Sequence, residues 1–287
     1  MTTLGFVGLG RMGGNMAARF LAAGYTVYGE QRSREHAQDL LREGLHWCDT
    51  PREAAEAADV LFTSLPDDDV LEEVASGPDG ILAGLSAPKI WVDLSTVRPC
   101  VSRKLAERVS AQGATMLDAP VSGSVPQVRA GTLTIMVGGD EQAYARVEPI
   151  LRELGSPTHI GENGQGLVLK LAINISLAVQ MLAFAEGLLL AERAGIDPKL
   201  AAGVMTQSAI GSPMLKARAD LVLDLPDDAW FDVGLMQKDV VLALDTGRDL
   251  RVPLPSAAAA DTVLTIARAS GYERSDIAVL YDVLAQL

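Results

Sequence analysis

The chain has 287 residues, of which 48% are hydrophobic and 21% are charged. These values are typical of a soluble globular protein with one large or two ordinary domains. Acidic residues outnumber basic ones by 37 to 24, the formal net charge is −13, and only 5% of the residues are aromatic. A chain with this balance and no basic stripe is not expected to bind nucleic acid. The 2 cysteines and 3 histidines do not cluster, so neither a disulfide framework nor a metal site is expected.

A glycine fingerprint stands at the start of the chain, directly after a short apolar run at residues 4–7 that predicts a strand. In a dinucleotide-binding fold the first glycine makes a tight turn, and the second lets the pyrophosphate approach the backbone. The third lets the following helix pack on the strand. The positive end of the helix dipole then points at the phosphates. The cofactor-binding residues predicted in this segment are Gly8, Leu9, Gly10, Arg11, Met12 and Gly13.

Up to about residue 160, short apolar runs alternate with helical stretches. This alternation is typical of a parallel sheet covered by helices on both faces. Because the first strand begins within a few residues of Met1, no secretory or transit peptide is expected, and the cytoplasm is the expected compartment. The predicted strands are residues 4–7, 26–28, 60–64, 90–93, 116–117 and 133–137.

The pattern changes near residue 160, and no strand is predicted beyond it. We therefore expect an α/β fold of two domains, with a Rossmann-type, doubly wound domain at residues 1–161 and an all-helical domain at residues 162–287. The second domain should begin with a long interdomain helix over residues 165–194. Shorter helices are predicted at residues 197–207, 213–223, 232–247, 256–270 and 275–286.

The long helix is apolar on most sides. Its longest uncharged run, residues 171–185, is shorter than the roughly 20 residues that a membrane span requires, so a buried core helix and no membrane contact are expected. In a two-domain monomer, part of the apolar surface of this helix would be left exposed to water. We therefore expect a homodimer or homotetramer.

Three polar residues follow the second predicted strand, in the region where Rossmann folds place an acid for the ribose of NAD or an arginine for the 2′-phosphate of NADP. They are Gln31, Arg32 and Ser33, and Glu30 precedes them. Both kinds of candidate are present. Spacing alone therefore leaves NAD and NADP open.

A polar turn follows the strand predicted at residues 116–117. It contains Ser122, Gly123 and Ser124 and lies at the carboxyl edge of the sheet, where ligands of open α/β folds bind. Backbone N–H groups and hydroxyls that converge there could hold a carboxylate. The alternative is an ordinary solvated turn.

Lys170 and Asn174 are four residues apart in the long predicted helix, so they share one face. A lysine in apolar surroundings either extends its amine to water or, when desolvated, has a lowered pKa that suits proton exchange near neutral pH. Lys238 and Asp239 form a second polar pair in a later helix. On pattern alone, that pair is most often a solvated helix face.

Five motifs together resemble the β-hydroxyacid dehydrogenase family, which contains 3-hydroxyisobutyrate dehydrogenases, tartronate semialdehyde reductases and glyoxylate or succinic semialdehyde reductases. The likeness spans essentially the whole chain. The motifs are residues 8–13, residues 92–96, residues 118–123 with 130–133, residues 164–166 leading to Lys170 and Asn174, and residues 238–239.

The resemblance implies roles for particular residues. Lys170 matches the catalytic lysine, Ser122 and Gly123 match the loop that holds the substrate carboxylate, and Asn174 matches the residue that orients the substrate. By the same resemblance, four residues line the cofactor: Leu65, Pro66, Thr96 and Lys238.

The resemblance also bears on the cofactor. Gln31, Arg32 and Ser33 look like the Asn-Arg-Thr run of NADP-preferring relatives, so NADP is favoured over NAD. The chain departs from the family pattern twice, because Ser124 replaces a usual second glycine and Ile173 replaces an asparagine. Both departures concern the identity of the substrate.

The expected function is therefore NADP(H)-dependent interconversion of a small β-hydroxy acid, or another short hydroxy acid, and its semialdehyde or oxo acid. The carboxylate-bearing substrate would be held at the loop, and Lys170 would act as general acid and base. An imine reductase with the same architecture is one alternative, although imine reductases generally have another residue at the lysine position. The other alternative is a non-catalytic cofactor-binding module.

Overall fold

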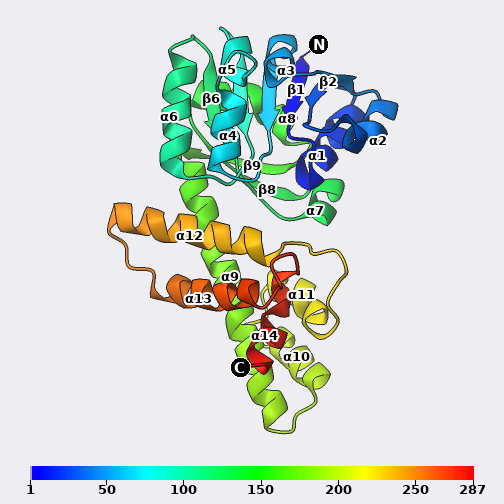
Figure 1. Cartoon of the computed structure of the whole chain (residues 1–287), viewed down its shortest axis with the longest axis vertical. Helices are drawn as coiled ribbons and strands as arrows, with labels where there is room; N and C mark the ends of the chain where they lie inside the picture. The colour runs from blue at the N-terminus through cyan, green and yellow to red at the C-terminus, as the bar shows by residue number, and fades with distance from the viewer. Residues whose placement is uncertain (1) are drawn as a thin grey trace. The chain divides into compact units, whose positions relative to one another are not determined.

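The structure is a computed structural model that describes residues 2–287. It divides into two compact units, Met1–Lys170 and Leu171–Leu287. The boundary falls inside the longest helix, α9 (Gln165–Arg193), which is labelled in Figure 1. Each unit has its own hydrophobic core.

The first unit is built on one sheet of nine strands within the described residues, in the order β3-β2-β1-β4-β5-β6-β8-β7, with β9 paired to β8. The six neighbouring strands β3, β2, β1, β4, β5 and β6 are parallel to one another. The strand order reverses at β1, which lies between β2 and β4. In open α/β sheets ligands bind outside the carboxyl ends of the strands at such a reversal. The strands are β1 (Thr3–Val7), β2 (Thr26–Glu30), β3 (His46–Trp47), β4 (Val60–Thr63), β5 (Ile90–Asp93), β6 (Thr115–Asp118), β7 (Val121–Ser122), β8 (Leu133–Gly138) and β9 (Gly155–Gly161).

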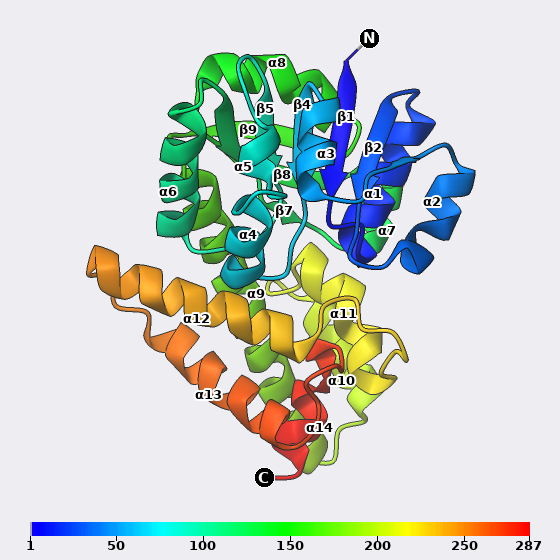
Figure 2. The same cartoon turned by 45° about the horizontal axis from the view of Figure 1, so that its top comes forward.

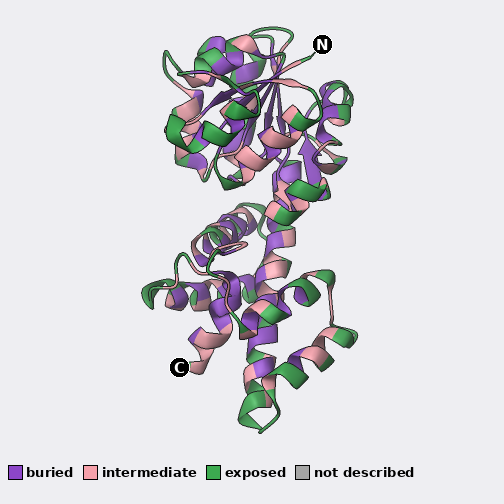
Figure 3. Ribbon diagram, turned by 90° about the vertical axis from the view of Figure 1, so that its right-hand side faces the viewer, coloured by how far each residue is buried: buried purple, intermediate pink, exposed green. Residues whose placement is uncertain are grey.

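Helices cover both faces of this sheet, as the alternation of apolar runs predicts. On one face α1 (Arg11–Ala22), α7 (Val125–Ala130) and α8 (Glu141–Leu151) pack against the strands. On the other face lie α3 (Pro51–Ala57), α4 (Asp68–Ala75), α5 (Ile81–Gly84) and α6 (Pro99–Ser110), as Figure 2 shows. The short helices η1 (Arg34–Ala37) and α2 (Gln38–Arg42) connect β2 to β3. The central strands β1, β4, β5 and β6 are therefore buried on both sides (Figure 3).

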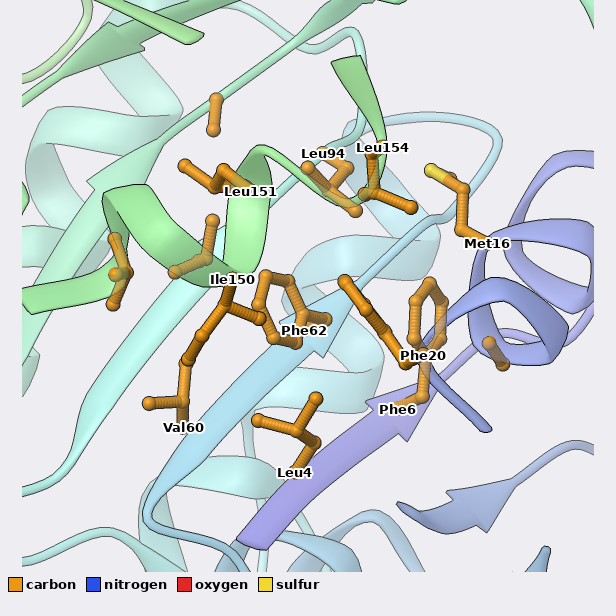
Figure 4. Close-up of a cluster of buried hydrophobic side chains, with 14 of the residues drawn as sticks. Leu4, Phe6, Met16, Phe20, Val60, Phe62, Leu94, Ile150, Leu151 and Leu154 are labelled. Atoms are coloured by element: carbon orange, nitrogen blue, oxygen red, sulfur yellow. The ribbon is translucent and has the colours of Figure 1, made fainter. Parts of the chain in front are cut away.

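Three phenylalanines fill the core between β1, β4 and α1. The ring centroids of Phe20 and Phe62 are 4.9 Å apart, and those of Phe6 and Phe62 are 6.1 Å apart (Figure 4). All three side chains are fully buried. Their packing fixes α1, and with it the turn that leads into α1, against the middle of the sheet.

The structure corrects two features of the expected sheet. The sheet is mixed, because β8 runs antiparallel to β6 and β7. The chain folds back from β7 onto β8 through the six-residue helix α7, so no full crossover helix brings β8 into the parallel direction. Three strands were not predicted: β3 and β7, which have two residues each, and β9, whose sequence contains a proline and lacks apolar alternation. Within the described residues β9 pairs only with β8, at an edge where proline is tolerated.

The second unit is helical, as predicted. It contains most of α9, five shorter α-helices and one single-turn 3₁₀ helix. These helices are coloured from yellow-green to red in Figures 1 and 2. By length and composition alone α9 could cross a membrane, but core helices of soluble proteins pass the same test. Here Met181, Phe184 and Leu188 of α9 are buried in the core of the unit. The remaining elements are α10 (Pro198–Gln207), α11 (Pro213–Leu223), α12 (Val233–Leu250), α13 (Pro255–Ala269) and α14 (Leu280–Ala285), the last preceded by the single turn η2 (Ile277–Val279).

Candidate functional site

The glycine loop lies where the strand order reverses, between β1 and α1. A Cβ on Gly13 would lie 2.0 Å from the carbonyl oxygen of Gly8, so only glycine lets the helix approach the loop this closely. Gly8 has φ +90°, and a Cβ there would lie 2.5 Å from the carbonyl oxygen of Ser64. Both glycines are therefore required by backbone packing within the protein.

Gly10 differs from its neighbours because a Cβ built on it would meet no atom within 4 Å. It is exposed and forms the N-cap of α1, where no side chain caps the helix and no acidic residue stands in the first turn. A bare helix N-terminus with open space before it suits a phosphate group. The residues present therefore fit the pyrophosphate of a dinucleotide cofactor.

The end of β2 is bonded to the glycine loop. The backbone N–H of Gly8 donates to the carbonyl oxygen of Glu30, and the N–H of Leu9 donates to Oε1 of Gln31, both at 3.1 Å. The structure thus brings Gln31 to the loop. Arg32 is exposed immediately after it, and Ser33 begins the turn η1.

A buried carboxylate connects the ends of β4 and β5. Asp93 is fully buried and accepts hydrogen bonds from Thr63 Oγ1 at 2.7 Å and from Ser95 Oγ at 2.6 Å. Ser95 Oγ in turn accepts from the backbone N–H of Leu65 at 2.9 Å. Burial raises the pKa of Asp93, and the hydrogen bonds from Ser95 and Thr63 oppose that rise. This network places Leu65, and with it Pro66 and Thr96, at the carboxyl edge of the sheet.

The loop expected to hold a carboxylate follows β6. Gly123 has φ +129°, and a Cβ there would lie 2.7 Å from Leu133, so the position requires glycine. Ser122 belongs to β7 and pairs with Thr134 of β8. The pairing of Ser122 and the positive φ of Gly123 therefore fix the conformation of this loop, in which Ser122 is half-buried and Gly123 is exposed.

Ser124 closes this loop as the N-cap of α7. Its φ of −124° is ordinary extended backbone, so the serine fits where relatives have a second glycine. Its backbone N–H and its hydroxyl both donate to Oε1 of Gln127, at 2.9 and 3.3 Å. Ser124 therefore also stabilises the start of α7.

Lys170 and Asn174 lie one turn apart near the start of α9, and both are buried, with exposed fractions of 8% and 1%. In the second unit Asn174 Nδ2 donates to Asp239 Oδ2 at 2.5 Å. Asp239 Oδ1 lies 3.2 Å from the ammonium group of Lys238. The structure thus joins Asn174, Lys238 and Asp239 in one polar cluster.

Two acids that the sequence analysis left without a role each fix a neighbouring group within their own unit. Asp239 binds the amide nitrogen of Asn174 and so directs the amide oxygen the other way. Asp93 fixes the Leu65 loop through Ser95. For Asp93, an acid inside an apolar strand was an available signal. For Asp239, the sequence gave no signal of its partner Asn174, because the only polar residue beside it was Lys238.

Comparison with known proteins also indicates a dinucleotide-binding enzyme. Residues 3–164 match the family model for the NAD-binding domain of 6-phosphogluconate dehydrogenase, and residues 164–284 match the NAD-binding model of NADP-dependent 3-hydroxyisobutyrate dehydrogenase. A 3-hydroxyisobutyrate dehydrogenase of Pseudomonas aeruginosa is 35% identical, with 98% of this chain and 99% of that protein covered. A 2-(hydroxymethyl)glutarate dehydrogenase of Eubacterium barkeri is 34% identical over 99% of this chain and 95% of that protein.

A solved structure described as Psf3 in complex with NADP+ and 2-OPP superposes with a TM-score of 0.90. It is 30% identical and covers 98% of this chain and 100% of the other. The matches span both units. They indicate an NAD(P)-dependent dehydrogenase or reductase that acts on a CH–OH group, with NADP or NAD as its cofactor.

Glu30 provides a pH-dependent test of the described site. Burial raises its pKa from the ordinary value of 4.5 to about 7, and Arg32 partly opposes the rise. Its pKa in the folded chain is thus above its pKa in the unfolded chain, so the folded form binds the proton more tightly. The contribution of the protonated Glu30 to the free energy of unfolding is fully present below pH 4.5 and is lost as the pH rises through 7.

We therefore expect Glu30→Gln to raise the free energy of unfolding by about 2 kcal/mol at pH 8. The gain should shrink toward pH 5, as measured by urea unfolding at both pH values. Glu35→Gln, at an exposed glutamate in η1, serves as the control and should change little at either pH. A gain for Glu30→Gln of equal size at pH 5 and pH 8 would contradict this account.

Proposed function

Because the chain belongs to the β-hydroxyacid dehydrogenase family, we propose that it interconverts a small hydroxy acid and its semialdehyde or oxo acid, with NADP(H) as cofactor and Lys170 as general acid and base. One observation carries the proposal. A lysine at the family's catalytic position is buried in α9, one turn before the buried amide of Asn174. Buried lysines are uncommon unless they have a specific task.

The mechanism follows from the chemistry of these residues. The cofactor, when bound, supplies or accepts the hydride. In the direction of reduction the ammonium group of Lys170 donates a proton to the substrate's carbonyl oxygen, and in the direction of oxidation the neutral amine takes the proton back from the hydroxyl group. The hydroxyl of Ser122 and the backbone N–H of Gly123 donate hydrogen bonds to the substrate carboxylate. Holding the substrate by its carboxylate orients the reacting carbon and supplies much of the rate gain.

Replacement of the lysine tests this role. Lys170→Ala should lower turnover of small semialdehydes by about 10²- to 10⁴-fold, the usual contribution of a general acid, while NADPH binding persists. Stopped-flow absorbance would measure turnover, and NADPH fluorescence would measure binding. The exposed Lys104 of α6 offers the control variant Lys104→Ala, which should behave like the parent enzyme.

Near-normal turnover of Lys170→Ala would refute the proposed role. The same assay should include cyclic imines as substrates, because the alternative enzyme class reduces them. NADPH oxidation with imines alone would replace the proposed function by imine reduction. Tight NADPH binding without any turnover would favour a non-catalytic module.

Arg32 is proposed to select NADP, since its exposed guanidinium follows directly after Gln31 at the end of β2. A guanidinium can bind a 2′-phosphate through two parallel hydrogen bonds. Arg32→Ala should therefore raise the KM for NADPH by about 10- to 100-fold and leave the KM for NADH nearly unchanged. Steady-state kinetics with both cofactors measures this, and Arg42→Ala on the exposed side of α2 is the control. Equal weakening of both cofactors would contradict the assignment.

We also propose that the chain forms a homodimer or homotetramer through its helical unit. Leu190 of α9 is 74% exposed, and Leu200 and Val204 of α10 are 62% and 61% exposed. Burial of such side chains stabilises an interface by about 25 cal/mol per Å² of apolar surface. Light scattering should give at least twice the mass of one 30.3 kDa chain, and Leu200→Glu with Val204→Glu should lower that mass. A parent protein that scatters as a single chain would contradict the proposal.

A further inference from the structure

The helix that carries Lys170 begins without a capping side chain of its own. α9 starts at Gln165, and the residue before it is Gly164, which has φ +88°. Glycine at this position cannot provide the oxygen that Ser, Thr, Asp or Asn usually supplies to the first turn. The N–H of Gln165 donates to the carbonyl oxygen of Glu162 at 3.0 Å, and the later N–H groups of that turn need an acceptor from elsewhere in the fold.

Asp118, the last residue of β6, supplies that acceptor. Its Oδ1 accepts from the N–H of Gly164 at 2.6 Å, and its Oδ2 accepts from the N–H of Leu167 at 3.0 Å. The side chain is fully buried. Each carboxylate oxygen thus binds one donor of the helix start, and its negative charge faces the positive end of the helix.

The contact is close as well as polar. A Cβ on Gly166 would lie 2.4 Å from the carbonyl oxygen of Met136 and 2.9 Å from Asp118 Oδ2. A second bond runs from Asn163 Nδ2 to the carbonyl oxygen of Met116 in β6, at 2.8 Å. The start of α9 therefore has little freedom to shift along or rotate on the sheet.

The same carboxylate lies between the two parts of the proposed reaction site. Ser122 and Gly123 follow Asp118 by four and five residues along the chain, and Lys170 follows Leu167 by three residues, less than one helical turn. Asp118 is the point at which the segment that carries the loop and the helix that carries the amine are bonded to each other.

We propose that Asp118 is a positioning residue: by capping α9 from the end of β6, it sets the place of the Lys170 amine relative to the substrate loop. This inference rests on the proposed function of Lys170. Asp118 touches neither substrate nor cofactor in this role. It acts through the helix, and its loss should therefore impair proton transfer more than cofactor binding.

Asp118→Asn tests the inference because it keeps the shape of the side chain. An amide offers one oxygen to two N–H donors, and its own NH₂ group would face the other donor. The rate of single-turnover hydride transfer should fall about 10- to 100-fold, the effect of a displacement of about 1 Å in a reaction site. NADPH binding should be unchanged. The control is Asp140→Asn, which alters the cap of α8 in the same unit, where Asp140 accepts from the N–H of Ala143 at 2.7 Å, and it should leave the rate unchanged.

A double-mutant cycle separates positioning from a general structural effect. In the Lys170→Ala background, Asp118→Asn should have little further effect on the rate, because the group that it displaces is already absent. Equal losses in both backgrounds, or no loss in the parent background, would overturn the inference. Failure of the proposed function has a different signature, namely near-normal turnover of Lys170→Ala itself.

If Asp118→Asn does not fold, Asn163→Ala provides the milder variant at the same junction. It removes the hydrogen bond to Met116 of β6 and the contact of the Asn163 amide with Asp118, and it keeps the bonds from Gly164 and Leu167 to the carboxylate. Its rate should fall by about 2- to 10-fold, the effect of a modest loss of hydrogen bonding, and again only in the presence of Lys170. The same loss without Lys170, or no loss at all, would count against the inference.

Discussion

The first turn of α9 lies directly on the backbone of the sheet, and this close approach constrains everything around Lys170. Gly166 can have no side chain because the carbonyl oxygen of Met136 occupies its place. Gly164 turns the chain with a positive φ, and the carboxylate of Asp118 occupies the position of the missing cap. The spacing of glycines before the helix is thus a packing requirement, and the position of the buried lysine follows from it.

Buried carboxylates organise the carboxyl edge of the sheet more widely. Asp93 and Asp118 stand side by side in register on β5 and β6. Desolvation raises the pKa of each, and backbone or hydroxyl donors offset that rise. Asp93 holds the loop of Leu65, and Asp118 holds the start of α9. In the second unit Asp239 similarly fixes the amide of Asn174. These acids orient the groups that would contact cofactor or substrate, and the proposed chemistry is left to Lys170.

Much of the fold could be predicted from the sequence because local patterns determined it. The apolar run before Gly8, the glycine turn and the long apolar helix each combine strong periodicity with clear boundaries, and the structure contains all three. The edge strand β9 could not be found, because Pro157 and its polar neighbours give no strand pattern. The antiparallel course of β8 depends on long-range pairing with β6 and β7, to which local periodicity does not respond.

The candidate site was predictable to the level of motifs. Spacing placed Gln31 at the end of the second strand, in the region expected to bind the cofactor ribose, and its hydrogen bond with Leu9 of the glycine loop became visible only in the structure. The partners of Asp118 and Asp239 lie 46 and 65 residues away, and no periodicity connects such pairs. Ser124 differs from these acids because its partner is close in the sequence. Its departure from the family pattern is explained by the hydrogen bonds that it donates to Gln127, three residues later.

The most direct measurement for the central claim is a crystal structure of the protein with NADP+ and a small hydroxy acid. The account predicts the Lys170 nitrogen within about 3 Å of the substrate's hydroxyl oxygen, with the substrate carboxylate bound at Ser122 and Gly123. A substrate bound in this way whose hydroxyl group lies beyond hydrogen-bond distance of Lys170, with another side chain in contact with it, would contradict the account.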